Sequence, residues 1–175
     1  MKILTPIIKT IGKVQSPLPK VKHKDFEQIW PNARSGDVIL SARPCSLSNL
    51  FIPGKYKHAG IIQMDNVIEA KFIGVVSTKL IDFCMKKDSL ILLRPKKIFG
   101  INILNQVSEK AFQALGAPYD FSFVRGGDSY YCSELIEHCW EGFVEVPKRK
   151  AYGKNVLNPN DLINHKDWTV VMEIN

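Results

Sequence analysis

Short apolar runs bounded by turn residues recur along the chain, and this pattern predicts β-strands. The runs lie at residues 37–41, 58–63, 66–71, 74–78 and 89–94, with a closing strand at 168–174. The segments 58–63 and 66–71 are joined so closely that we expect an antiparallel hairpin, with a turn centred on Asp65-Asn66. The run 89–94 is almost entirely apolar and indicates a strand covered on both faces. We therefore expect a central antiparallel sheet of about five strands.

Two segments instead repeat apolar residues every three or four positions, which predicts helices. The first covers residues 101–115 and is followed by Gly116, a residue type that commonly ends helices. The second covers residues 130–140 and places Cys132 in its first turn. Shorter helices are predicted at 25–30, 80–86 and 158–163, and helical turns at 7–11 and 46–51. Together these elements predict an α+β fold in which the sheet packs against helices.

The length and composition fit a single domain. The chain has 175 residues, of which 45% are hydrophobic and 23% charged. Residues 1–24 carry lysines and three prolines without a sustained period, so we interpret them as an N-terminal basic arm. Residues 25–175 form the predicted domain.

The net charge of +7 favours an anionic partner but is spread over short clusters. A peripheral contact with an anionic surface is one expectation. No basic-aromatic interleaving or recognition helix is present, so we expect no specific nucleic-acid partner. No apolar run is long enough to cross a membrane, and Pro6 and Lys9 interrupt any signal-peptide core. A cytoplasmic location is therefore expected.

The four cysteines do not have the spacing of a metal site or a disulfide framework. They lie at positions 45, 84, 132 and 139, without a Cys-x-x-Cys pair. We expect no metal and no other cofactor. Cys132 differs from the other three because unpaired amides and the positive end of a helix dipole favour its thiolate. A buried cysteine with only a packing role is the alternative.

A thiolate nucleophile needs a base, and His58 in the predicted hairpin is the candidate. Adjacent strands bring side chains on one face within about 5 Å, so Glu69 can lie beside His58 and orient its ring. Asp65 or Asn66 could take the place of Glu69. His58 could also be an ordinary hydrogen-bonded strand residue.

Several motifs in this order resemble the permuted papain-like amidases of the YiiX-like group. That group is the circularly permuted branch of the NlpC-type cysteine peptidases, whose relatives include the lecithin:retinol acyltransferases. The matching segments are 36–40, 58–61, 67–70, 74–75, 93–95, 116–121 and 131–135. They span about residues 35–165, and the histidine precedes the cysteine, as it does in the permuted branch.

The resemblance implies a papain-like domain in which Cys132 is the nucleophile, His58 the general base and acid, and Glu69 the residue that orients the imidazole. It implies a cysteine hydrolase or acyltransferase that acts on an amide or ester through a thioacyl enzyme. Peptides of the cell wall, lipids and N-acyl compounds are all compatible substrates. Tyr119 and Asp120 are expected to line the cleft, although aromatic packing is an alternative for them. The competing hypothesis is a non-catalytic ligand- or membrane-binding module with the same fold. The oligomeric state is left open.

Overall fold

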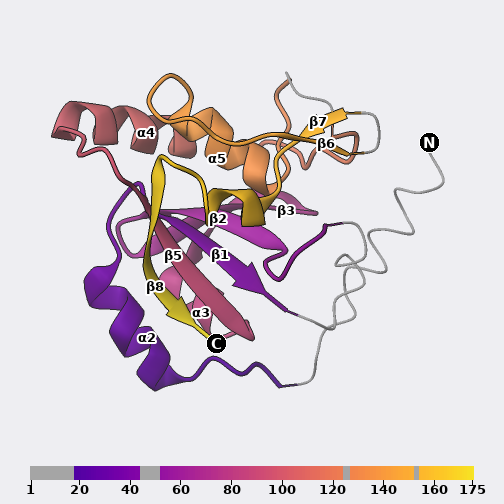
Figure 1. Cartoon of the computed structure of the whole chain (residues 1–175). Helices are drawn as coiled ribbons and strands as arrows, with labels where there is room; N and C mark the ends of the chain where they lie inside the picture. The colour runs from indigo at the N-terminus through magenta and orange to yellow at the C-terminus, as the bar shows by residue number, and fades with distance from the viewer. Residues whose placement is uncertain (1–17, 44–51, 124–126, 152–153) are drawn as a thin grey trace.

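The computed structural model describes residues 18–43, 52–123, 127–151 and 154–175 (Figure 1). The helical turns predicted at 7–11 and 46–51 lie outside these residues, as does Cys45. Val21, which the sequence places in the basic arm, is 2% exposed, and its N–H donates to the carbonyl of Lys87. The last part of the predicted arm therefore packs against the domain.

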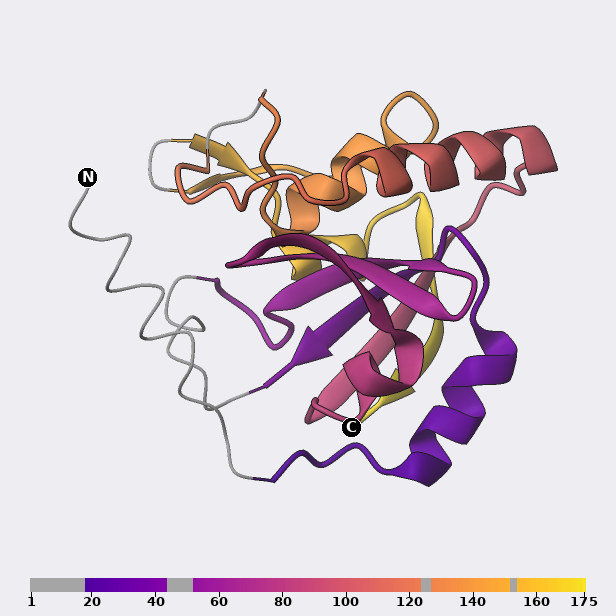
Figure 2. The same cartoon turned by 180° about the vertical axis from the view of Figure 1, so that it is seen from behind.

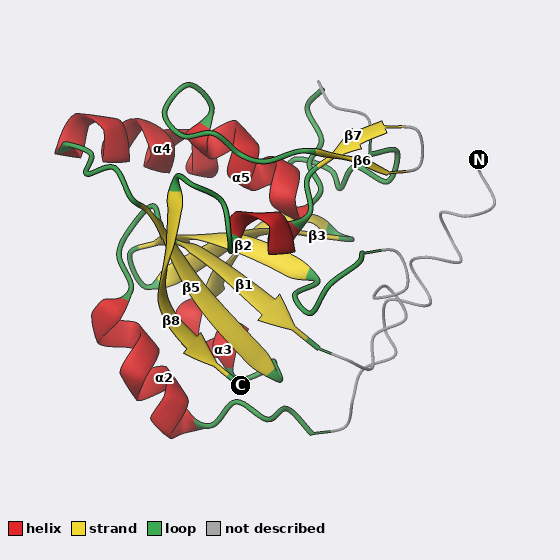
Figure 3. Cartoon of the chain, in the orientation of Figure 1, coloured by secondary structure: helices red, strands yellow, loops and turns green. Residues whose placement is uncertain are grey.

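The central sheet has six antiparallel strands rather than about five (Figure 3). Their order across the sheet is β4-β3-β2-β1-β5-β8. The strands are β1 Val38–Ala42, β2 His58–Gln63, β3 Asn66–Lys71, β4 Gly74–Lys79, β5 Ser89–Pro95 and β8 Trp168–Ile174. The additional member is the closing strand β8, which pairs with β5 at the sheet edge and makes β5 an interior strand, as its apolar sequence predicts.

Helices cover both faces of this sheet (Figures 1 and 2). The helical elements are α2 His23–Ile29, η1 Trp30–Asn32, α3 Leu80–Cys84, α4 Ile101–Gln113, α5 Cys132–Trp140 and η3 Pro159–Leu162. Helices α4 and α5 lie side by side over one face, and α2 and α3 lie on the other. A second small hairpin, β6 Arg149–Ala151 and β7 Lys154–Val156, was not expected from the sequence.

The alternation of side chains along the strands divides the core into two parts. The face beneath α4 and α5 buries Val38, Leu40, Ala59, Ile61, Ile68, Ile91 and Leu93. The opposite face, towards α2 and α3, buries Ile39, Ile62, Val67, Leu90 and Leu92. Because the central strands are buried on both faces, their sequences are nearly continuous apolar runs.

The hairpin between β2 and β3 forms as predicted, but its turn is shifted. Gln63 pairs with Asn66, so the turn consists of Met64 and Asp65. Met64, which lies before the predicted Asp65-Asn66 centre of the turn, adopts the left-handed conformation with φ of 53°. Asp65 accepts a hydrogen bond from Trp30 Nε1 at 3.2 Å, which ties this end of the sheet to η1.

A buried ion pair fixes the start of β1 to the end of β5. Asp37 is 2% exposed, and its two carboxylate oxygens accept hydrogen bonds from Nε and Nη2 of Arg94 at 2.7 and 2.6 Å. Burial raises the pKa of Asp37 even though Arg94 opposes the shift. This bidentate pair gives the Gly36-Asp37 and Leu93-Arg94-Pro95 segments a structural role in holding adjacent strands together.

Candidate active site

Cys132 is the first residue of α5, and the chain around it fixes the start of this helix. The carboxylate of Glu134 accepts a hydrogen bond from the backbone N–H of Tyr131, the N-cap residue, at 3.3 Å. The hydroxyl of Tyr131 in turn accepts from the N–H of Leu157 at 3.1 Å. Ser133 donates to the carbonyl of Leu157 at 2.9 Å. The N-terminus of α5, and the thiol on it, is therefore anchored to a distant segment of the chain.

His58 is the first residue of β2 and lies against the thiol. Its imidazole lies close enough to the side chain of Cys132 for the two groups to shift each other's pKa. Nε2 lies 2.7 Å from Oε2 of Glu69, which leaves Nδ1 as the ring nitrogen for the thiol. The ring stacks on Phe83 of α3, with centroids 6.0 Å apart and planes 28° apart. The side chain of His58 remains 22% exposed, so a substrate can reach it from solvent.

Glu69 reaches His58 diagonally across the hairpin, and Gly60 makes this possible. Ile61 pairs with Ile68, so the register places Gly60 opposite Glu69. A Cβ at Gly60 would lie 2.3 Å from Cγ1 of Val67 and 3.5 Å from Cβ of Glu69. A larger residue would therefore clash with Val67 and crowd the backbone beside Glu69, which explains the glycine at this strand position.

The Glu69 carboxylate is 1% exposed and fully engaged by neighbours. Its Oε1 accepts a hydrogen bond from Thr78 at 2.6 Å and pairs with Nζ of Lys71 at 2.5 Å. Burial alone would raise the pKa of Glu69, but hydrogen bonds and charges from His58, Lys71 and Thr78 hold it well below its usual range. Glu69 is therefore ionised and able to stabilise a positive charge on His58.

The same interactions couple the thiol to the imidazole. Burial by itself raises the pKa of Cys132, but the hydrogen bond and charge of His58 and the N–H of Ala59 outweigh burial and lower it. Burial likewise lowers the pKa of His58, while its hydrogen bonds to Cys132 and Glu69 reverse the shift and raise it. The geometry thus favours a thiolate–imidazolium pair.

The other described cysteines have no such partner. Burial raises the pKa values of Cys84 and Cys139 to about 12, so both remain thiols at neutral pH. From the sequence, both are expected to be core or loop residues, and the structure places them in the two apolar cores. Asp65, the alternative to Glu69, bonds to Trp30 instead.

Tyr119 and Asp120, predicted to line the cleft, belong to the segment of the chain that connects α4 to α5. Tyr119 packs against the rings of Phe72 and Phe121, with centroids 5.2 and 4.9 Å away. Burial, followed by the negative charge on Cys132, raises the pKa of Tyr119 well above its usual value, which places its phenol near the thiol. Asp120 is buried and accepts hydrogen bonds from the N–H and hydroxyl of Ser122. A substrate-binding role for both residues stays a prediction.

Sequence reasoning missed two polar partners, Lys71 and Thr78. Lys71 ends β3, two residues after Glu69 on the same strand, and contacts its carboxylate. Thr78 of β4 pairs with Val67 of β3 and reaches Glu69 from the neighbouring strand. A polar residue in the alternating β4 sequence was the available signal for Thr78. The backbone N–H of Ala59 could not be found from the sequence, because every residue except proline has a backbone N–H.

Among the described residues, one group has the donor atoms of a metal site. Glu145, His165 and Asp167 place one donor atom each within 4.8 Å of one another. The Glu145 carboxylate is also paired with Lys166 at 3.0 Å. The donor types suit a divalent cation. The group includes none of the three residues at the thiol.

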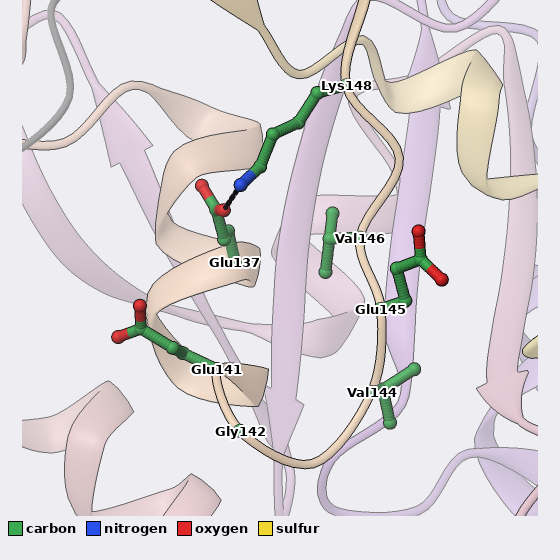
Figure 4. Close-up of a pocket in the computed structure, with 7 residues that line it drawn as sticks. All are labelled: Glu137, Glu141, Gly142, Val144, Glu145, Val146 and Lys148. Carbon is green, nitrogen blue, oxygen red and sulfur yellow. Dashed lines mark ion pairs between the residues drawn. The ribbon is translucent and has the colours of Figure 1, made fainter.

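A cavity of about 420 Å³ lies beside the C-terminal half of α5 (Figure 4). It is lined by Glu137, Glu141, Gly142, Val144, Glu145, Val146 and Lys148. Glu137 and Lys148 form an ion pair of 2.7 Å at its wall. The lining residue of α5 nearest to Cys132 is Glu137, five residues further along the helix, and Cys132, His58 and Glu69 are not among the lining residues. The cavity is separate from the candidate active site.

The antiparallel sheet with a cysteine at a helix start and a His–Glu pair on the hairpin defines a permuted papain-like protein of the cysteine hydrolase class. Comparison with protein families agrees with this description. Residues 32–172 match the model of the permuted papain-like amidase enzymes, YaeF/YiiX, C92 family. The chain therefore belongs to this family.

A solved structure shows the same fold. The crystal structure of the metalloprotein yiiX from Escherichia coli O157:H7 superimposes with a TM-score of 0.70 at 22% sequence identity. The match covers 82% of this chain and 98% of that chain. Comparison with curated proteins gives no match. No helix among the described residues is both long and apolar enough to cross a membrane.

Proposed function

We propose that this protein is a cysteine amidase that cleaves an amide bond through a thioacyl intermediate on Cys132. The observation that carries the proposal is that His58, hydrogen-bonded to the buried Glu69 carboxylate, also interacts electrostatically with the side chain of Cys132. Membership of the amidase family supports the reaction class. The three residues come from the start of α5, the start of β2 and the middle of β3.

In the first half-reaction, the Cys132 thiolate attacks the carbonyl carbon and forms a carbon–sulfur bond. The carbonyl electrons move to oxygen, and the backbone N–H of Cys132 at the start of α5 is positioned to donate to that oxyanion. The intermediate then expels the amine, which takes the proton of the His58 imidazolium as it leaves. The products are a thioacyl enzyme, a neutral imidazole and a free amine.

In the second half-reaction, neutral His58 takes a proton from water while the water oxygen attacks the thioacyl carbon. Collapse of this intermediate breaks the carbon–sulfur bond, releases the carboxylic acid and restores the thiolate–imidazolium pair. Glu69 holds the ring in position and stabilises its positive form in both halves. If an amine or alcohol replaces water, the same steps give an acyltransferase.

The proposed partner is an amide- or ester-containing peptide or lipid. The E. coli relative is described as a metalloprotein, and each step above uses groups of this chain. A peripheral contact with an anionic surface and a cytoplasmic location stay proposals that rest on the sequence.

The direct test is to trap the acyl group. Incubation with 4-nitrophenyl acetate, followed by acid quenching and mass spectrometry, should find one acetyl thioester on Cys132. Replacement of His58 by Ala should greatly reduce its formation, whereas Cys139→Ala should leave it unchanged. Acetylation spread equally over the cysteines, or no dependence on His58, would contradict catalysis and favour a binding module instead.

A further inference from the structure

Basic side chains gather at the end of the sheet that carries His58. Lys71, the last residue of β3, binds the same Glu69 carboxylate as His58, the first residue of β2. Lys87 follows α3, and its Nζ lies 4.4 Å from the centre of the Phe83 ring. The same ring stacks on the imidazole of His58 at 6.0 Å. One aromatic side chain therefore contacts both the imidazole and a lysine ammonium.

The two lysines differ in how their charges are balanced. Lys71 pairs with Glu69 at 2.5 Å and also donates to Thr78 at 2.9 Å. Within the part of the chain that the structure describes, Lys87 forms no ion pair with a carboxylate. The adjacent Asp88 accepts a hydrogen bond from the N–H of Lys20 at 3.2 Å instead. Lys87 is thus held by Phe83 in a partly buried position without a matched negative charge.

The surroundings of Lys87 contain more positive than negative charge. Glu69 is the carboxylate that interacts with Lys87, and it already binds both His58 and Lys71. Lys71 and Arg43 repel the Lys87 ammonium. Burial, reinforced by that repulsion, lowers the pKa of Lys87 to about 8. Like charges held together in this way cost free energy, and a bound anion relieves that cost.

We propose that Lys87, supported by Lys71, binds a carboxylate or phosphate group of the acyl substrate beside His58. The substrate class is then an acyl compound that carries an oxyanion close to the bond being cleaved. This assignment rests on the proposed amidase function because it concerns the substrate of the same site. It also gives the excess of basic residues a local role that the diffuse sequence pattern did not reveal.

Two alkylating reagents of almost equal size test this proposal. Iodoacetate carries a carboxylate where iodoacetamide carries a neutral amide, and both lose iodide to a thiolate. The rate of Cys132 alkylation by each reagent is followed by mass spectrometry in the full chain, in Lys87→Gln and in Lys79→Gln. Lys79 is the matched control because it is exposed and ends β4 opposite Asn66, at the far end of the hairpin from His58.

We expect Lys87→Gln to lower the ratio of the iodoacetate rate to the iodoacetamide rate by about threefold to tenfold, since a nearby charge selectively attracts the anionic reagent. Lys79→Gln should leave that ratio unchanged although it removes the same charge. An equal ratio in the parent protein and Lys87→Gln overturns the anion site. A proportional loss of both rates also overturns it, because that result indicates altered packing around His58.

The same experiment separates this inference from the proposed function. If the thiol is not activated, iodoacetamide will not select Cys132 over Cys139 in the parent protein, and the amidase proposal fails by itself. If iodoacetamide selects Cys132 but the reagent ratio ignores Lys87, only the anion site fails.

A second experiment identifies the anion. Inorganic phosphate and acetate are compared as protectants of Cys132 against iodoacetamide, with sodium chloride at equal ionic strength. Protection by phosphate alone identifies a phosphate group, protection by acetate as well identifies a carboxylate, and protection by neither overturns the site.

Discussion

The two cysteines of α5 occupy similar positions and have opposite chemistry. Cys132 and Cys139 are seven residues apart on one face of the same helix, and they are 3% and 0% exposed. The pKa of Cys132 is lowered, whereas burial raises that of Cys139 to about 12. Burial opposes ionisation at both positions. The difference comes from the His58 ring, the N–H of Ala59 and the helix N-terminus, which only Cys132 has.

This comparison shows that exposure does not identify a reactive thiol. A cysteine inside an apolar core is unreactive because nothing there stabilises its negative charge. At the start of α5 the chain supplies a hydrogen-bond donor and a positive ring within reach of the sulfur. The reactive cysteine is therefore recognised by its partners rather than by its accessibility.

The largest expected effect follows from removing each of the two thiols in turn. Cys132→Ala should reduce acyl turnover by at least about a thousandfold, because the covalent intermediate can no longer form. Cys139→Ala should keep turnover within about twofold of the parent protein, since its sulfur is remote from the ring. Steady-state hydrolysis of an activated ester measures both. Comparable turnover in the two variants would contradict the proposed nucleophile.

Loss of the base should make Cys132 more similar to Cys139. The lowered pKa of Cys132 means that the parent protein keeps its thiolate to lower pH than an ordinary thiol does. In His58→Ala the largest group that opposes burial is lost and only the N–H of Ala59 and the side chain of Ser133 remain, so we expect the pKa of Cys132 to rise. The iodoacetamide rate at pH 6 should fall by about 100-fold or more, because the thiolate fraction at that pH falls as the pKa rises.

The control for this measurement is the labelling of Cys139 in the same samples. Its rate should be slow in both proteins and unchanged by the substitution. If Cys132 keeps its reactivity at pH 6 without His58, the helix start rather than the imidazole activates the thiol.

Glu69→Gln should have an intermediate effect. Loss of the carboxylate removes the charge that stabilises the imidazolium, so turnover should fall by about 10- to 1000-fold while Cys132 remains present. Because the folded pKa of Glu69 is depressed, its ionisation stabilises the fold above the unfolded pKa and loses that effect as the pH falls towards the folded value. The stability difference between parent and variant should therefore be larger at pH 7 than at pH 3, as measured by urea denaturation. An equal difference at both values would contradict this role.

The smallest effect concerns the packing role of Cys139. Cys139→Ala should lower the free energy of unfolding by about 1–2 kcal/mol because it leaves a small cavity in the core. Cys139→Ser should cost more, since it buries a hydroxyl in the same apolar site. Denaturant titration of the three proteins orders them, and a more stable serine variant would contradict an apolar environment.

Much of the architecture could be predicted because apolar runs and helical periods set the strands and helices directly. The β2–β3 hairpin, the interior β5 strand and the position of Cys132 at a helix start are confirmed. The closing strand at 168–174 was predicted, but the number of strands in the sheet was underestimated because sheet membership depends on contacts between distant segments. The turn was misplaced because Met64 adopts a left-handed conformation that its residue type disfavours.

The site could be predicted only as far as neighbouring strands and family motifs define it. His58 and Glu69 were found because a short hairpin restricts their separation. Thr78 joins the network from a third strand, and Lys87 approaches His58 through a packed phenylalanine. Neither of these two relations has a fixed spacing in the sequence, and the contact of Lys71 with Glu69, two residues before it, is seen only in the packed structure. Such partners become visible only when the packed side chains are known.

Because His58 and Cys132 are far apart in the chain, the reactivity of the thiol reports when the two segments that carry them assemble during refolding. The two residues are 74 positions apart (132 − 58), so fast alkylation at acidic pH requires that β2 and α5 have docked. Helix formation alone precedes such long-range contacts by orders of magnitude in time. Pulses of iodoacetamide during refolding would therefore time the assembly of the two halves, with Cys139 reporting in the same sample when the core closes around it.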